Sequence, residues 1–409
     1  MEPTPTEPPR LRRRIGFSEI PRNVRRIVYA NVLGGVGFGY LIVFITAYLP
    51  QIGIGPEVVG LILGAQGISM VVTAIPLGWY SDRRGRKGLL LAASVILPPS
   101  LLVFAFTTDL RWLVLASVAA GVGEGAFLST WNAIIADQTT AAQRNAAFSL
   151  SFVLNNVAVG AGFALPLAFP ALQAWSRLDS HTIHVGALVV TDAFGFVMPV
   201  AFAVLLRGYR ETLRVREGRP KWMDWKPMLK FSGANGLIGL GAGFFIPLVP
   251  TWLFLKFGVP DTWSGPLLAL SNVTIGIAAI GSAALAKRYG SVRAIVMAQG
   301  LSTIFLLSLA FATNAVVAGG LYLIRAALMN MSAPIGDSFL MGIVAPEQRG
   351  LASAVNSIIW RLPNSVTTVL GGVLMGAGYY DLPIFLATAF YVSSITSFFV
   401  MFRNLKPTT

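Results

Sequence analysis

Long stretches without a charged side chain are the feature that most constrains this sequence. Nine such stretches, each at least 19 residues long, occur in the 409-residue chain. The hydrocarbon core of a membrane needs about 20 apolar residues per helix, so each stretch is long enough to cross it. The stretches are residues 27–56, 58–81, 88–108, 145–176, 231–255, 262–286, 294–324, 362–380 and 382–402.

Single charges interrupt the remaining apolar sequence, and allowing one charge per span predicts twelve transmembrane helices. β-Strands of membrane barrels alternate in polarity and run only about 10 residues, so they do not fit these stretches. The first apolar stretch is much longer than the roughly 7–15 apolar residues of a signal peptide, and we expect it to be retained as a helix. The predicted helices cover residues 27–49, 57–80, 88–107, 112–136, 146–169, 184–206, 231–255, 264–286, 292–313, 316–343, 350–376 and 384–402.

Lysine and arginine are distributed unevenly among the predicted loops. If the N-terminus is cytoplasmic, 26 of the 31 lysines and arginines fall in cytoplasmic segments and 3 in outer ones. Such a bias sets the orientation of a membrane protein. It predicts a multi-pass protein of the plasma or inner membrane with both termini in the cytoplasm. The net charge of +14 is then explained by topology beside an anionic leaflet, and no nucleic-acid partner is expected.

The second half of the sequence repeats the first at an offset near 205 residues. Tyr40 falls on Phe244, and three glycines spaced two apart recur in both halves. Glycines inside a span let helices approach closely, which fits them better than a nucleotide loop does. The predicted organisation is a basic tail (1–26), a six-helix bundle (27–206), a charged cytoplasmic linker (207–230), a second six-helix bundle (231–402) and a short tail (403–409).

The segment between the second and third predicted helices carries a recognisable motif. It resembles the signature loop of the major facilitator superfamily, in which an acid, an arginine and a glycine precede an arginine and a lysine. The resemblance implies an all-α membrane protein with twelve helices in two pseudo-symmetric bundles, acting as a secondary transporter of small molecules and not as an enzyme. It also implies no cofactor and, we expect, a monomer in the lipid bilayer. The segment reads Gly78-Trp79-Tyr80-Ser81-Asp82-Arg83-Arg84-Gly85-Arg86-Lys87.

The same loop predicts a conformational latch. Arg86 lies four residues after Asp82, and Asp137 ends the fourth helix close enough to join them. The resemblance gives this set the role of a cytoplasmic latch that holds the outward-facing state, with the N-terminus of the eleventh helix near Arg349 as the opposing partner. The residues assigned to the latch are Gly78, Asp82, Arg83, Gly85, Arg86, Asp137 and Arg349.

Charges inside predicted spans cost about 2.5–3.5 kcal/mol each at the bilayer centre, so they usually face the protein interior and serve function. Arginine keeps its proton, and Arg325 and Arg361 therefore need an acid, a substrate anion or water. Three acids outnumber these two arginines, which leaves one carboxyl that holds a proton more readily than in water. We assign proton coupling to Glu124 and Asp337.

The resemblance places the first, fourth, seventh and tenth helices around the transport cavity. We therefore expect Glu124 and Arg325 to meet from opposite halves, in a contact that breaks as the halves rock. Asp337 and Arg361, on neighbouring helices, are expected to form a second pair. Asp192 lies on a helix that the family uses as outer scaffold, so no coupling role is predicted for it.

Polar and aromatic side chains on the same helices are further candidates. We expect the substrate to contact Arg325, Arg361, Asn330, Asn132, Asn156, Trp131, Trp360, Tyr40 and Phe244. The two histidines, His181 and His184, are expected to be solvated residues of an outer loop. With no cysteine and only these two histidines, no metal site is predicted.

Three functions remain open on this sequence. The first is proton-coupled export of small amphipathic molecules, in the manner of the drug:proton antiporters that the chain resembles. The second is proton-coupled symport of a small organic or inorganic anion held by Arg325 and Arg361, because arginine matches carboxylate and phosphate geometry. The third is a lipid scramblase or a non-transporting receptor on the same fold.

Overall fold

A computed structural model describes residues 19–209, 225–344 and 348–404. These residues form helices joined by short turns, with no strand among them. Much of the predicted basic tail (1–26) and linker (207–230), and most of the last tail (403–409), fall outside the described residues.

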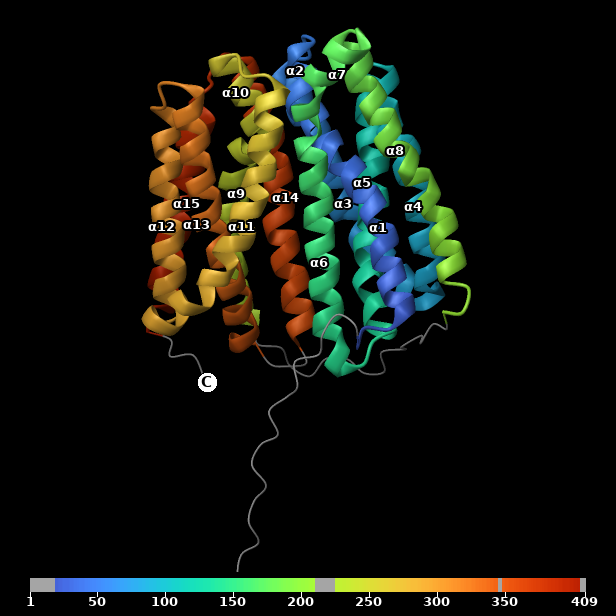
Figure 1. Cartoon of the computed structure of the whole chain (residues 1–409). Helices are drawn as coiled ribbons and strands as arrows, with labels where there is room; N and C mark the ends of the chain where they lie inside the picture. The colour runs from blue at the N-terminus through green and yellow to red at the C-terminus, as the bar shows by residue number, and fades with distance from the viewer. Residues whose placement is uncertain (1–18, 210–224, 345–347, 405–409) are drawn as a thin grey trace, which may run out of the picture.

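Helices of the two halves follow one another in the same order (Figure 1). The first half contains α1 (Arg22–Val43), η2 (Phe44–Tyr48), α2 (Leu49–Gln51), α3 (Pro56–Arg84), α4 (Arg86–Phe106), α5 (Leu110–Asp137), α6 (Ala141–Ala164), η3 (Leu165–Ala168), α7 (Phe169–Ser176) and α8 (Ser180–Leu205). The second half contains α9 (Trp225–Phe245), η4 (Ile246–Leu248), α10 (Val249–Phe257), α11 (Asp261–Tyr289), α12 (Ser291–Ala310), α13 (Ala315–Ile343), α14 (Arg349–Gly376) and α15 (Leu382–Phe402).

Ten helical segments of the described chain are long and apolar enough to cross a membrane, and α11, which bends by 45°, makes eleven. Each corresponds to a predicted span. The twelfth predicted span, 350–376, is α14, a helix of 28 residues. It is less apolar than the others because it carries Arg361 and two asparagines, and it packs between the two halves against α3 and α9.

The internal repeat is visible in how the glycine-rich helices pack. A Cβ atom on Gly39 of α1 would lie 2.2 Å from the carbonyl oxygen of Val159 on α6. The repeat-related Gly243 of α9 would meet the carbonyl oxygen of Asn364 on α14 at 2.1 Å. Both halves therefore join their first and fifth spans through glycine, which confirms a packing role for these residues.

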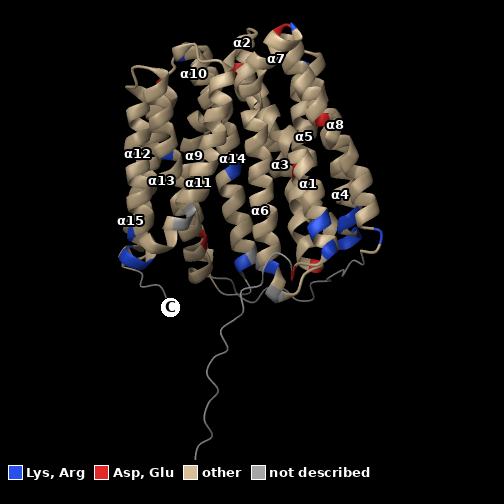
Figure 2. Cartoon of the chain, in the orientation of Figure 1, with Lys and Arg blue, Asp and Glu red and all other residues tan. Residues whose placement is uncertain are grey.

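Basic residues gather at one end of the bundle (Figure 2). We call this the basic end; α1 begins there and α15 ends there (Figure 1). The turns after α3 and α11 also lie at this end, where Gly85 has a φ of 108° and its repeat partner Gly290 a φ of 78°. Only glycine adopts such angles without strain. The turns after α3 and α11 therefore have the same backbone conformation. We call the opposite end the far end.

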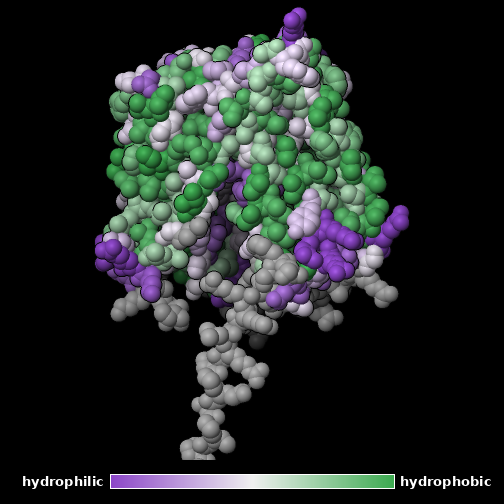
Figure 3. All heavy atoms as spheres, viewed as in Figure 1, coloured by the Kyte–Doolittle hydropathy of each residue, from purple (hydrophilic) through white to green (hydrophobic). Residues whose placement is uncertain are grey.

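The two halves close against each other at the far end and separate toward the basic end. One buried core cluster at the far end combines both halves and includes Tyr48 and Trp252. Toward the basic end, each half has its own cluster, around Trp131 and around Phe339. A groove between the halves, lined by hydrophilic residues, opens at the basic end (Figure 3).

Candidate functional site

Glu124 lies on α5 and faces a cavity of about 370 Å³ inside the first half. The side-chain amide of Gln66 on α3 donates a hydrogen bond to Glu124 Oε2 at 3.1 Å. This bond crosses a close contact between the helices, because a Cβ on Gly121 would lie 2.2 Å from the Gln66 carbonyl oxygen. Among the described residues, no lysine or arginine lies within ion-pair distance of Glu124, so its carboxyl has only an amide partner.

Arg361 of α14 links the two halves of the site. It lines the cavity of the first half and also a larger cavity of about 630 Å³ in the second half. Within the described chain it forms no ion pair, which leaves its guanidinium able to meet an anion that enters the groove.

The predicted contact between Glu124 and Arg325 is absent from this conformation. Arg325 of α13 is only 4% exposed, and its guanidinium donates a hydrogen bond to the hydroxyl of Tyr391 on α15 at 2.6 Å. Arg325 therefore points toward a neighbour in its own half, whereas Glu124 lies in the other half beside Gln66. The two side chains line different cavities.

The expected pair of Asp337 and Arg361 is also not formed. Both residues line the cavity of the second half, but the described residues contain no ion pair between them. Asp337 is exposed because the open groove reaches it from the basic end. A hydrated carboxylate needs no cationic partner, which accounts for the missing pair.

The cavity of the second half is rich in amides. Asn330 and Trp360 line it, as predicted. Sequence reasoning missed Asn235 and Asn356, which line it as well and share a hydrogen bond of 3.0 Å, and Gln299, which donates to Ser332 at 3.1 Å. Their only signal in the sequence was an amide within an uncharged run.

Five other predicted contact residues lie away from both cavities. Trp131 packs in the core and donates to Ser151. Tyr40 is buried at the far end, with its hydroxyl on the carbonyl of His184. Phe244 stacks on Phe390. Asn132 is exposed, and Asn156 bonds back to its own helix at Phe152. The three aromatic residues serve helix packing in this conformation.

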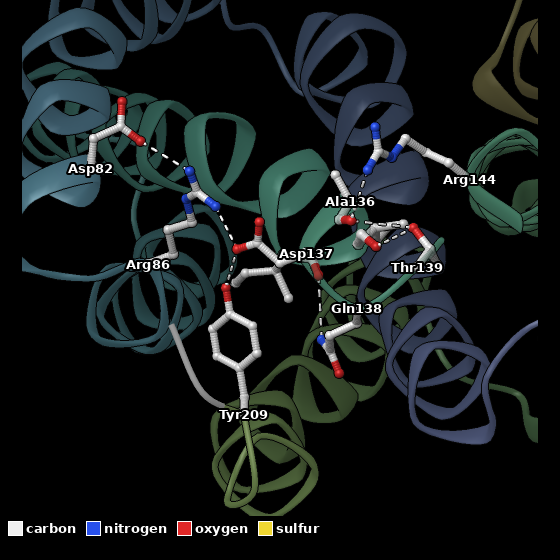
Figure 4. A network of polar contacts seen from close by, with 10 residues as sticks. Asp82, Arg86, Ala136, Asp137, Gln138, Thr139, Arg144 and Tyr209 are labelled. Atoms are coloured by element: carbon white, nitrogen blue, oxygen red, sulfur yellow. Dashed lines mark hydrogen bonds and ion pairs between the residues drawn. The ribbon is translucent and has the colours of Figure 1, made fainter. Parts of the chain in front are cut away.

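The latch residues of the first half do assemble (Figure 4). Arg86 contacts Asp82 at 3.1 Å and Asp137 at 2.5 Å. Tyr209, which follows α8, donates to the same oxygen of Asp137 at 2.6 Å. Burial, and then the neighbouring Asp137 carboxylate, raise the pKa of the Tyr209 phenol, so it remains a donor at neutral pH.

The remaining latch residues lie elsewhere. Arg83 stacks on the ring of Trp79 at 3.8 Å. A Cβ on Gly78 would be 3.7 Å from Ser129, so this glycine leaves ordinary space at α5. Arg349 is exposed and donates to the carbonyl of Met341 in its own half. The opposing half of the latch is therefore disengaged, as an open basic end requires.

A buried hydrogen bond joins the two halves at the far end, and it corrects the prediction for His184. This histidine is 3% exposed rather than solvated. Its Nε2 lies 2.9 Å from Oδ2 of Asp261 at the start of α11, in the other half. Gln51 donates to Oδ1 of Asp261 at 3.0 Å, and the ring of Tyr48 stacks on His184 at 3.9 Å. His181 is exposed, as expected, and bonds the Tyr48 hydroxyl.

Comparisons with known proteins place these features in context. A sequence model of the Major Facilitator Superfamily matches residues 27–326. Sugar efflux transporter A of Escherichia coli strain K12 is 22% identical over 331 residues, which are 80% of this chain and 81% of that protein. The class C tetracycline resistance protein of Escherichia coli is 27% identical over 276 residues, or 62% of this chain and 64% of that protein. The crystal structure of an auto-inhibited POT family peptide transporter has a TM-score of 0.74 at 14% identity and covers 94% of this chain and 98% of that chain.

Proposed function

We propose that this protein couples proton movement to the export of small amphipathic molecules. The chain belongs to the Major Facilitator Superfamily, whose members are multi-pass membrane transporters. The observation that carries this proposal is Glu124. It is an acid inside the membrane-spanning bundle, with an amide as its only hydrogen-bond partner among the described residues, and it faces a cavity that Arg361 of the other half also lines.

Alternating access gives this arrangement its mechanism. In the conformation open at the basic end, water reaches the groove and Glu124 can exchange its proton with the groove. Closing that end encloses the carboxyl, and enclosing an uncompensated carboxylate is costly. Closure is therefore favoured by a proton on Glu124, or by a cationic substrate that adds its charge to that of Arg361 in the same cavity. Because either a proton or a cationic substrate can neutralise the carboxyl, the two are transported in exchange for one another.

Orientation decides the direction of transport. The positive-inside rule supports a cytoplasmic basic end. We propose the cell membrane as the location, with the first residues of α1 and the last residues of α15 on the cytoplasmic side. The open groove then loads from the cytoplasm. The name of one relative supports the same direction, because it is a sugar efflux transporter.

Transport in proteoliposomes under an imposed pH gradient tests the proposal. The purified protein should accumulate at least one member of a labelled panel (ethidium, tetraphenylphosphonium and a neutral amphipath) against its gradient. Glu124→Gln should reduce this accumulation at least tenfold while leaving downhill exchange. Glu57→Gln, at an exposed acid of α3, is the matched control and should behave like the parent. Equal accumulation by Glu124→Gln would refute the proposal.

Symport of a small anion is the second candidate, and Arg361 favours it. This arginine lines both cavities without an ion pair among the described residues. Arg325 lines the cavity of the second half together with Arg361. One of its nitrogens donates to Tyr391, whereas its Nε has no hydrogen-bond partner among the described residues, so it can support this candidate as well. Uptake of a labelled carboxylate that requires a proton gradient and disappears in Arg361→Gln, with no transport of the cationic panel, would favour the anion over the amphipath.

A further inference from the structure

Asp192 on α8 is a buried acid for which the transport scheme above has no use. Its side chain is 4% exposed, and it lines the cavity of the first half together with Glu124. Its Oδ2 atom has no hydrogen-bond partner among the described residues, and no described lysine or arginine is within ion-pair distance. Buried polar atoms nearly always have a partner, so this one calls for a ligand.

Apolar side chains form most of the cavity wall around the two acids. Phe38, Met70, Leu97, Pro98, Phe127 and Met198 line it, from helices α1, α3, α4, α5 and α8. The volume of about 370 Å³ falls in the range of small-molecule pockets. Methionine and phenylalanine adapt to ring systems of different shape. The wall therefore suits a compact apolar body.

The charged side chains in the cavity determine which sign of ligand charge it favours. Two carboxyls line it, Asp192 and Glu124, and among the described residues the one basic side chain that does so is that of Arg361, from the other half. When both carboxyls are ionised, one arginine leaves one negative charge uncompensated. An anionic ligand would increase this excess, and a neutral ligand would leave it. A cationic group beside Asp192 removes it.

We propose that this cavity binds a monovalent organic cation with an apolar body, its charge held beside Asp192. The inference rests on the proposed export function, whose substrate class it names. Asp192 is a binding residue in this scheme, and Glu124 remains the residue that exchanges protons. The polar, amide-lined cavity of the second half would take the hydrophilic parts of a larger substrate.

Equilibrium binding to the purified full chain in detergent, with no gradient, tests the site. Labelled tetraphenylphosphonium should bind the parent protein, whereas tetraphenylborate, its anionic counterpart of nearly the same shape, should bind at least tenfold more weakly. Asp192→Asn should weaken tetraphenylphosphonium binding at least tenfold, and Asp192→Glu should restore most of it. Glu57→Gln should leave it unchanged. Equal binding by the parent and Asp192→Asn, or a preference for the anion, would overturn the proposal.

A second measurement needs no substitution. Dicyclohexylcarbodiimide modifies protonated carboxyls in apolar surroundings, and peptide mass spectrometry locates the adduct. Tetraphenylphosphonium should protect Asp192 of the parent protein from modification, and full labelling in its presence would contradict the proposal. Because neither measurement uses a gradient, the cation site can stand while proton coupling fails, or fail while coupling stands.

Discussion

Asp137 shows how one carboxylate organises the basic end of the first half. It accepts from Arg86 at the signature turn and from Tyr209 after α8. The sequence predicted Arg86 and Asp82 from their spacing and Asp137 from its place at a helix end. It did not predict Tyr209, because a tyrosine in a charged segment carries no signal for a partner 72 residues away.

Removal of the Tyr209 hydroxyl should loosen this end and change its pH dependence. The pKa of Tyr209 is raised in the folded protein, so its stabilising contribution is complete below the ordinary tyrosine pKa of about 10 and is lost as pH rises through the folded value. Tyr209→Phe should cost about 1 kcal/mol at neutral pH. Thermal unfolding in detergent should show that the parent loses this advantage over Tyr209→Phe above about pH 10. A difference that stays constant from pH 7 to pH 12 would contradict the assignment.

Charged residues within spans were the hardest to pair from sequence. Counting three acids against two arginines predicted one unpaired acid and a contact between Arg325 and Glu124, whereas none of the three acids forms an ion pair among the described residues. The side-chain direction on a helix and the hydroxyl of Tyr391 on a distant helix decide the outcome, and neither can be read from a single sequence. For the same reason His184, at the edge of a predicted loop, was missed as a buried residue.

Helices, in contrast, were predictable almost to their ends. Uncharged length locates a span whatever its partners are, and the observed spans begin and end within about seven residues of the predicted ranges. Short π- or 3-10-helical segments lie within three of the spans, at Phe44–Tyr48, Leu165–Ala168 and Ile246–Leu248. The last was foreseeable from Pro247, whereas Pro334 and Pro363 lie inside continuous helices.

Glycine at the helix crossings should be irreplaceable where backbones touch. Gly39→Ala places a Cβ against the Val159 carbonyl of α6, and such overpacking costs about 1–3 kcal/mol. Gly320→Ala, in α13 with no atom within 4 Å of the new Cβ, is the control and should be neutral or slightly stabilising. The midpoint of thermal unfolding in detergent should fall only for Gly39→Ala. Equal midpoints would mean that α1 and α6 do not touch in the membrane.

At the scale of the whole molecule, the far-end cluster determines which side is closed. His184 and Gln51 of one half hold Asp261 of the other in a buried site. Removing one partner of a buried hydrogen bond leaves an unpaired polar group and costs about 1–3 kcal/mol. We expect this cost to fall on the conformation open at the basic end, because the bond is formed in that conformation. Loss of the bond should therefore favour opening of the far end.

Asp261→Asn tests this expectation. The chain has no cysteine, so spin labels can be placed at Leu178 and Tyr379, two exposed far-end residues in opposite halves. Pulsed electron resonance should show a longer distance component for the variant than for the parent. The same shift should appear in His184→Ala. Unchanged distance distributions in both variants would show that the bond does not hold the far end closed.

Proton movement driven by substrate is the most direct test of the central claim that Glu124 couples transport to protons. Proteoliposomes that contain a trapped pH indicator would receive, on the outside, the panel compound that accumulates most strongly. No pH gradient would be imposed. The parent protein should move protons against the direction of the compound, and Glu124→Gln should carry the compound downhill with no change in internal pH. A proton flux of parental size in Glu124→Gln would contradict the account.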